Sequence, residues 1–297
     1  MFVKYATLFV CLFGLWWLTS CDRKKVDDKM ISVTIEPERY FAQKIAGDKY
    51  KFNCVVPSGQ SPETYDPTPK EMVEIGRSMA YFRIGEIGFE QAWMDKIKEN
   101  NPELKIYNMS HGMTMIAEEE HNHEHDGECS HHHGSVDPHI WTSTEGAKVI
   151  SWNILNALID IDPENTKYYW GNYNKLLDEI DFTEAQITEL LSDVKGEAFI
   201  IYHPALTYFA KEFGMKQLCI ELDGKEPSPA TLKELVETAK SENAKVVFIQ
   251  KEFDQKNAEL IAKETNCKLV VINPLSYDWS KEMIDIAKSL SKYGKAD

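Results

Sequence analysis

Positive charge is scarce in this chain of 297 residues. Lysine and arginine together number 33 against 48 aspartates and glutamates, which gives a formal net charge of −15 at pH 7. Nucleic-acid binding needs basic patches that displace counterions from phosphates, so we expect no nucleic-acid partner. An acidic surface instead concentrates cations near the protein, although it is also an ordinary means of staying soluble.

Long apolar runs are confined to the N-terminus. Residues 1–20 carry one charged side chain, Lys4, and the apolar stretch ends at Leu-Thr-Ser-Cys, residues 18–21. The run has the length of a signal-peptide core and is short for a membrane span of about 20 residues. We predict a secretory signal over 1–20 and a charged tether over 21–30, with an uncleaved anchor helix as the alternative. The four residues also resemble the bacterial lipoprotein signal, which implies that Cys21 carries a lipid outside the cytoplasm.

Cysteine is also sparse, with six residues in all. Four of them lie beyond Cys21: Cys54, Cys129, Cys219 and Cys267. An exported protein can form disulfides, but connectivity cannot be read from sequence alone. The one pairing that we consider is Cys219–Cys267.

Short apolar runs alternate with helical patterns in two series. The first has expected strands at 31–35, 52–56, 81–84 and 104–108, with helices at 37–46, 69–79 and 89–98. The second has expected strands at 198–202, 216–220, 246–250 and 269–272, with helices at 205–213, 229–241 and 255–265. This alternation is typical of parallel sheets covered by helices. We therefore predict an α/β fold with two parallel-sheet lobes.

The segment 163–194 separates the two series and contains no proline after its first residue. Its apolar residues recur at helical spacing. We predict one helix of about 30 residues, roughly 45 Å long; two helices broken near Gly171 or 181–183 are the alternative. The expected units are an N-terminal lobe at 31–162, the linking helix, and a C-terminal lobe at 195–297. A long rigid helix should resist wide hinge opening of the cleft between the lobes.

The segment 118–134 has almost no apolar residues and cannot contribute to a core. Six of the nine histidines lie in it: His121, His123, His125, His131, His132 and His133. Imidazoles among carboxylates suit zinc above all. Ligands in such a loop must be ordered on binding, so we expect low affinity. A solvated tract without function is the alternative.

A tighter metal site needs ordered ligands. In parallel α/β sheets, ligands bind beyond the carboxyl ends of the strands. Glu63 follows the strand expected at 52–56, His139 closes the loop after 104–108, and His203 ends the strand at 198–202. Each lies close to a proline, which restricts the local backbone. We predict that one carboxylate and two imidazoles meet in the cleft.

Three motifs carry a resemblance to a known family. They are residues 61–69 (Ser-Pro-Glu-Thr-Tyr-Asp-Pro-Thr-Pro), 137–141 (Asp-Pro-His-Ile-Trp) and 203–205 (His-Pro-Ala). These segments, and the long central helix, resemble the cluster A-I zinc and manganese solute-binding lipoproteins of bacterial ABC importers. The resemblance spans nearly the whole chain beyond the signal. The His-rich loop just before His139 is similar to the zinc branch rather than the manganese branch.

The resemblance implies a monomeric, lipid-anchored protein that binds Zn²⁺ with high affinity and delivers it to an importer's permease and ATPase. A manganese importer component is one alternative, and a surface adhesin or a zinc buffer is another. An exported zinc hydrolase is a third, because His₂Glu is also a catalytic zinc set. The chain lacks a His-Glu-x-x-His helix, a Gly-x-Ser-x-Gly elbow and a phosphate loop, so we expect no enzyme.

The sequence departs from the family pattern at two places. Glu63 stands where the family usually has histidine. Residues 273–276 (Asn-Pro-Leu-Ser) hold no acid where many members have a fourth, carboxylate ligand. The fourth ligand is then a water, Asp278 or a histidine of the loop.

Overall fold

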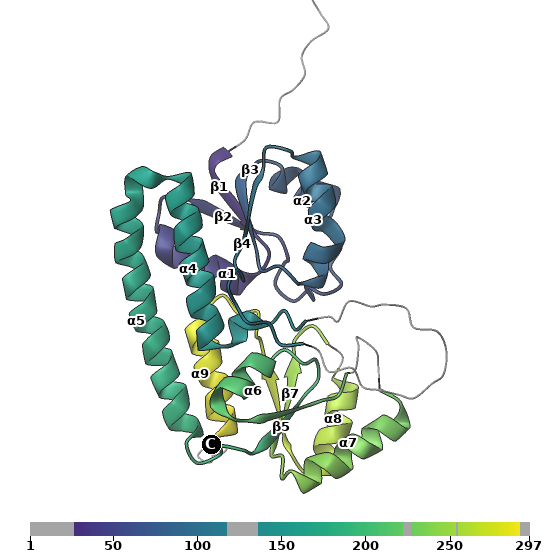
Figure 1. Ribbon diagram of the computed structural model, residues 1–297. Coiled ribbons are helices and arrows are strands. Elements are labelled where there is room, and N and C mark those ends of the chain that lie inside the picture. Colours follow the sequence, from purple (N-terminus) through teal and green to yellow (C-terminus); the bar gives the residue numbers. More distant parts are fainter. Residues whose placement is uncertain (1–26, 118–135, 222–226, 254, 292–297) are drawn as a thin grey trace, which may run out of the picture.

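Two four-stranded parallel sheets form the framework of the computed structural model, which describes residues 27–117, 136–221, 227–253 and 255–291 (Figure 1). The strands of the first sheet are β1 (Asp27–Val33), β2 (Lys51–Cys54), β3 (Ser78–Arg83) and β4 (Lys105–Asn108). Those of the second are β5 (Ala198–Ile201), β6 (Lys216–Cys219), β7 (Val246–Gln250) and β8 (Lys268–Ile272). Their orders, β2-β1-β3-β4 and β6-β5-β7-β8, are equivalent. The predicted α/β fold with two lobes is confirmed.

Helices connect successive strands and cover both sheets, as parallel pairing requires. Around the first sheet they are α1 (Glu36–Ala46), α2 (Pro69–Ile75) and α3 (Gly88–Asn100); around the second they are α6 (Thr207–Phe213), α7 (Pro229–Ser241) and α8 (Lys256–Thr265). A capping box of Thr68 and Glu71 begins α2. This helix is shorter than the predicted 69–79, because Gly76 ends it and β3 begins at Ser78.

The segment between the lobes forms one α-helix, α5 (Thr166–Leu191), after a 3₁₀ turn at Pro163–Asn165. Its 26 residues give a length of about 39 Å. The buried side chains form one stripe along it: Tyr169, Tyr173, Leu176, Ile180, Thr183, Ile187 and Leu191. There is no break at Gly171 or at 181–183, so the single-helix prediction is confirmed.

Two helices that the sequence patterns did not indicate run beside α5: α4 (Thr144–Ile161) and α9 (Trp279–Leu290) (Figure 1). Helix α9 packs against α5 and reaches α1 of the first lobe, where the Trp279 and Phe41 ring centroids are 5.2 Å apart. The end of the chain therefore returns to the first lobe. The lobes are joined by packed helices as well as by chain connectivity.

The apolar core has two parts. One cluster runs through the first lobe, the α4–α5–α9 layer and the inner face of the second sheet, where Phe199 and Ile201 point inward. A separate cluster lies between the outer face of that sheet and helices α7 and α8, and Ile200 and Val247 belong to it. The alternation along β5 follows from the two-residue repeat of a strand.

The pairing of Cys219 with Cys267, the one that the sequence left under consideration, does not form, because both side chains are free thiols. Cys219 ends β6 and Cys267 precedes β8, and these strands are the two edges of the second sheet. Three strand spacings separate them by about 14 Å, beyond the roughly 7 Å between Cα atoms that a disulfide spans. Cys129 lies outside the described residues.

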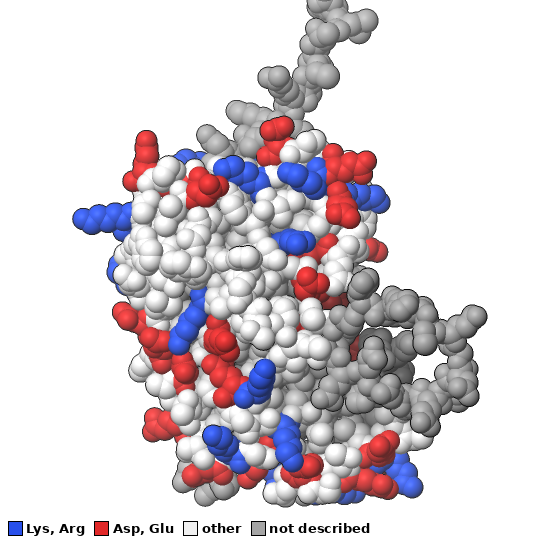
Figure 2. All heavy atoms as spheres, viewed as in Figure 1, with Lys and Arg blue, Asp and Glu red and all other residues white. Residues whose placement is uncertain are grey.

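Charges of both signs are interspersed over the face shown in Figure 2, and the lysines and arginines seen there do not gather into one patch. Within the described ranges, no helix has the length and apolarity that crossing a bilayer requires.

Candidate metal site

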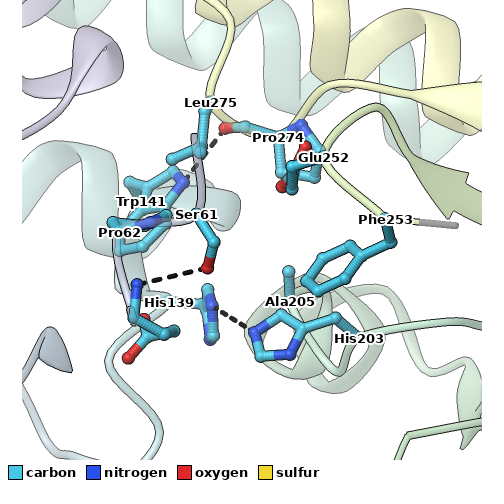
Figure 3. A pocket seen from close by; sticks show the side chains of 11 residues that line it. Ser61, Pro62, His139, Trp141, His203, Ala205, Glu252, Phe253, Pro274 and Leu275 are labelled. Atoms are coloured by element: carbon cyan, nitrogen blue, oxygen red, sulfur yellow. Dashed lines mark hydrogen bonds between the residues drawn. The ribbon is translucent and has the colours of Figure 1, made fainter. Parts of the chain in front are cut away.

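A cavity of about 10 Å³ lies where the loops of the two lobes meet (Figure 3). That is about the room that one water molecule occupies. Every loop around it follows the carboxyl end of a parallel strand, as expected for this fold class. The described residues that line it and carry a polar side chain are Ser61, Glu63, His139, Trp141, His203 and Glu252.

His139 is held by Asp137 from the same turn. The Asp137 Oδ1 atom accepts hydrogen bonds from both the backbone N–H and the Nδ1 of His139, each at 2.8 Å. Burial alone would raise the pKa of Asp137, but the charge and hydrogen bonds of His139, with a bond from Thr207, lower it. The Tyr208 hydroxyl of the second lobe donates to the Asp137 carbonyl at 2.8 Å. His139 is therefore fixed in orientation before any ligand arrives.

His203 is held in the same way from the second lobe. Its Nδ1 atom lies 3.2 Å from Glu221 Oε2. The Gln250 side chain donates to the His203 carbonyl at 2.7 Å, and Phe253 stacks on the ring with centroids 5.4 Å apart. The His203 side chain keeps 17% of its surface exposed against 7% for His139, so His203 forms the solvent side of the pair.

The two imidazoles face one another across the cleft, with their Nε2 atoms 3.3 Å apart (Figure 3). Each Nδ1 lies within hydrogen-bond distance of a carboxylate. In the tautomer in which both Nδ1–H groups donate to these carboxylates, both Nε2 atoms present a lone pair to a metal. Two zinc–nitrogen bonds of about 2.0–2.1 Å at the tetrahedral angle place the nitrogens roughly 3.3–3.4 Å apart. The observed spacing is therefore that of two ligands on one tetrahedral ion.

Glu63 lies on the loop after β2 and is tied to the start of α3. Its Oε2 accepts from Gly88 N–H at 2.9 Å, and Phe89 N–H donates to the Pro62 carbonyl at 2.9 Å. A Cβ at position 88 would come within 2.3 Å of the Glu63 carbonyl oxygen, so only glycine fits there. The other carboxylate oxygen, Oε1, is buried with no hydrogen-bond partner. A bound cation would satisfy it.

Three predicted ligands thus line one cavity, yet within the described ranges no set of three His, Cys, Asp or Glu is close enough to hold an ion. The two imidazoles are close enough to bind one ion. A carboxylate must move closer to them before three side chains can hold the ion. Asp278, a predicted candidate for the fourth ligand, precedes α9 and is not among the lining residues. The six histidines of 118–134, and Cys21, lie outside the described residues.

The sequence reasoning missed two acidic residues at the site. Glu221 follows β6 and supports His203; Glu252 follows β7 and lines the cavity. Burial raises the pKa of Glu252 above its ordinary value. A hydrogen bond from its own backbone N–H and the charges of His203 and His139 lower the pKa, but burial has the larger effect. Both stand at carboxyl ends of parallel strands, the rule that had indicated His203. Applied to every strand, that rule would have found them.

Comparisons with known proteins show the family of the chain. A family described as the periplasmic component A of the zinc-uptake complex matches residues 31–292. The chain is 28% identical over 289 residues to the high-affinity zinc uptake system protein ZnuA of Bacillus subtilis, covering 93% of this chain and 90% of that protein. It is 27% identical over 280 residues to the zinc-binding lipoprotein AdcA of Streptococcus pneumoniae, covering 92% of this chain and 55% of AdcA. The chain thus spans about half the length of AdcA.

Solved structures give the same result. A crystal structure of ZnuA has a TM-score of 0.81 and 32% identity, covering 89% of this chain and 98% of that one. A zinc-bound ZnuA deletion mutant has a TM-score of 0.80 and 32% identity, covering 91% of this chain and 100% of that one. A binding protein rather than an enzyme was expected, and the match agrees. The chain belongs to the family of the periplasmic zinc-binding component A of zinc-uptake complexes.

Proposed function

We propose that this protein binds one Zn²⁺ ion between His139 and His203, with Glu63 as a third ligand, and delivers it to an importer in the membrane. The 3.3 Å between the two Nε2 atoms carries this proposal, because it matches two ligands of one tetrahedral ion. The orphaned Oε1 of Glu63 supports the third ligand. The acidic surface would raise the local concentration of cations.

Membership of a zinc-uptake family supports an extracytoplasmic location and an ABC importer as the partner, through its permease and ATPase. We further propose that Cys21 carries a lipid that anchors the chain, since it ends a lipoprotein-like signal. The segment 118–134 would act as a weak collector of zinc before transfer to the cleft. The protein would work as a monomer.

Zinc is favoured over manganese because two of the three ligands are imidazoles, whereas manganese prefers oxygen ligands. A zinc hydrolase is disfavoured by the family match, which is to a component of zinc-uptake complexes.

Metal content and chelator competition on protein purified without a histidine tag test the proposal. We expect one tight zinc site per chain and a weaker phase. Deleting 118–134 should remove the weak phase and leave the tight one. Loss of the tight phase on that deletion would show that the cleft is not the main site.

A further inference from the structure

We propose that Glu252 is the fourth protein ligand of the cleft site, reaching the ion from the loop between β7 and α8. This inference rests on the proposed function. The site would then take a divalent cation in a shell of two imidazoles and two carboxylates.

The second lobe contributes few side chains to the cavity that can bind a metal. Six of its described residues line the cavity: His203, Ala205, Glu252, Phe253, Pro274 and Leu275. Four of them have apolar side chains. Only His203 and Glu252 carry a side chain that can bind a metal. Asp278, in the same lobe, does not line the cavity.

The position of Glu252 is linked to that of His203 on both sides along the chain. Gln250, two residues earlier, donates to the His203 carbonyl at 2.7 Å, and its own side chain is 1% exposed. Phe253, the next residue, stacks on the His203 ring at an interplanar angle of 25°. Figure 3 shows Glu252 across the cavity from the two imidazoles, on the side of Pro274. Its carboxylate therefore borders the same cavity as the two imidazoles.

Charge balance gives the physical reason for a second carboxylate. Two neutral imidazoles and Glu63 leave a net charge of +1 on a site that holds a divalent ion. An unbalanced charge is costly in a cavity largely shielded from water, and a paired one costs far less. Glu252 brings the site to neutrality and completes the four ligands of tetrahedral zinc. Since the described residues hold no ready-made set of three ligands, the approach of Glu252 would accompany ion capture.

The test compares Glu252→Gln and Glu252→Ala with two charge-matched controls, Glu237→Gln on α7 and Asp278→Asn. Glu237 is an exposed carboxylate, with 69% of its side-chain surface accessible. Zinc affinity is measured by chelator competition in the full chain. The visible spectrum of the Co²⁺-loaded protein reports the coordination number, because four-coordinate cobalt absorbs much more strongly than five- or six-coordinate cobalt.

We expect both Glu252 variants to lose more affinity than the roughly 10–100-fold that removal of an outer-shell partner costs. Their cobalt spectrum should also weaken, while both controls keep wild-type values. Unchanged affinity in Glu252→Gln would overturn the assignment and leave the zinc function standing. A weaker affinity with an unchanged cobalt spectrum would also overturn it, because Glu252 would then only position other groups. Absence of tight zinc binding in the wild type would instead refute the proposed function.

Discussion

The two lobes have the same strand order but are packed differently. Both faces of the first sheet belong to one core cluster, which continues into the α4–α5–α9 layer. The second sheet has one face in that cluster and the other in a separate one under α7 and α8. Each lobe offers one histidine supported by a carboxylate.

This difference indicates where movement is easiest. The loop of Glu63 and the turn of His139 rest on the shared core, and Tyr208 and Trp141 tie that turn to the second lobe. The Trp141 indole donates to the Pro274 carbonyl at 3.0 Å. The loop of Glu252 instead joins β7 to α8, at the edge of the smaller cluster. Separate cooperative units open at different free energies, so we expect this loop to move before the first lobe does.

The largest expected effect comes from replacing the two histidines one at a time, which tests whether each lobe contributes a ligand to the metal site. His139→Ala and His203→Ala should each lower zinc affinity by about 100-fold or more, because a ligand contributes more than the outer-shell partners that cost 10–100-fold. Chelator competition measures the loss, and circular dichroism checks that both variants fold. Wild-type affinity in either variant would remove that lobe from the site.

A second prediction concerns buried acids in the first lobe. Burial raises the pKa of Glu90 to about 7. Burial, and then the charge of Glu90, raises the pKa of Glu38 well above its ordinary value. Between pH 4.5 and 7 these two acids bind more protons in the folded chain than in the unfolded chain, so their contribution to the free energy of unfolding falls as pH rises through this window. For Glu90 the fall is about 3 kcal/mol.

Urea unfolding of metal-free protein at pH 5 and pH 8 measures this fall. Glu38→Gln should make it smaller, because it removes one of the two buried acids whose pKa is raised, whereas the exposed-face control Glu237→Gln should leave it unchanged. If the free energy of unfolding of the wild-type protein is the same at both pH values, this lobe does not bury a protonated acid.

A third prediction compares the carboxylates that support the two histidines. Glu221→Gln and Asp137→Asn should each weaken zinc binding roughly 10–100-fold, because an amide no longer fixes the imidazole tautomer. Asp137→Asn should have the larger effect, since Asp137 Oδ1 also holds the His139 backbone N–H. Absent effects, measured by the same competition assay, would mean that the histidines are oriented by packing alone. Equal losses would contradict only the predicted ranking of the two variants.

A smaller effect is expected at the third ligand. Glu63→His should keep or slightly strengthen zinc binding, because imidazole is a softer donor than carboxylate, and it should weaken manganese binding. Glu63→Ala should weaken both. Parallel titrations with the two ions give the preference. A higher preference for manganese in Glu63→His would show that Glu63 does not touch the metal.

The smallest expected change is in overall shape. Helices α4, α5 and α9 pack together along both lobes, and a continuous helix cannot absorb the dihedral changes of a hinge. Small-angle scattering of apo and zinc-loaded protein without 118–134 should give radii of gyration that agree within about 1 Å, since closure then involves loops rather than whole domains. Compaction by several ångströms would refute the stiff connection.

The sequence by itself determined the repeated α/β pattern, the long helix and three cleft residues. These features are local: strand and helix periodicities differ, and a residue that follows a parallel strand lies at the functional edge of the sheet. The buried positions of helix α4 form one face, but small and polar residues such as Gly146 and Ser151 lie on it beside Ile150 and Ile154. The apolar stripe is therefore interrupted, and the sequence pattern did not indicate the helix.

Only the tertiary structure decided which donors meet. Glu221 and Glu252 are two of 48 acidic residues. Their positions after expected strands mark them as candidates, but the sequence does not say that one contacts His203 and the other lines the cavity. The pairing of β5 with β6 and β7 brings their loops to His203, and the α4–α5–α9 layer sets its distance from His139. Separations of this kind depend on contacts between residues more than 60 positions apart, which local periodicity does not encode.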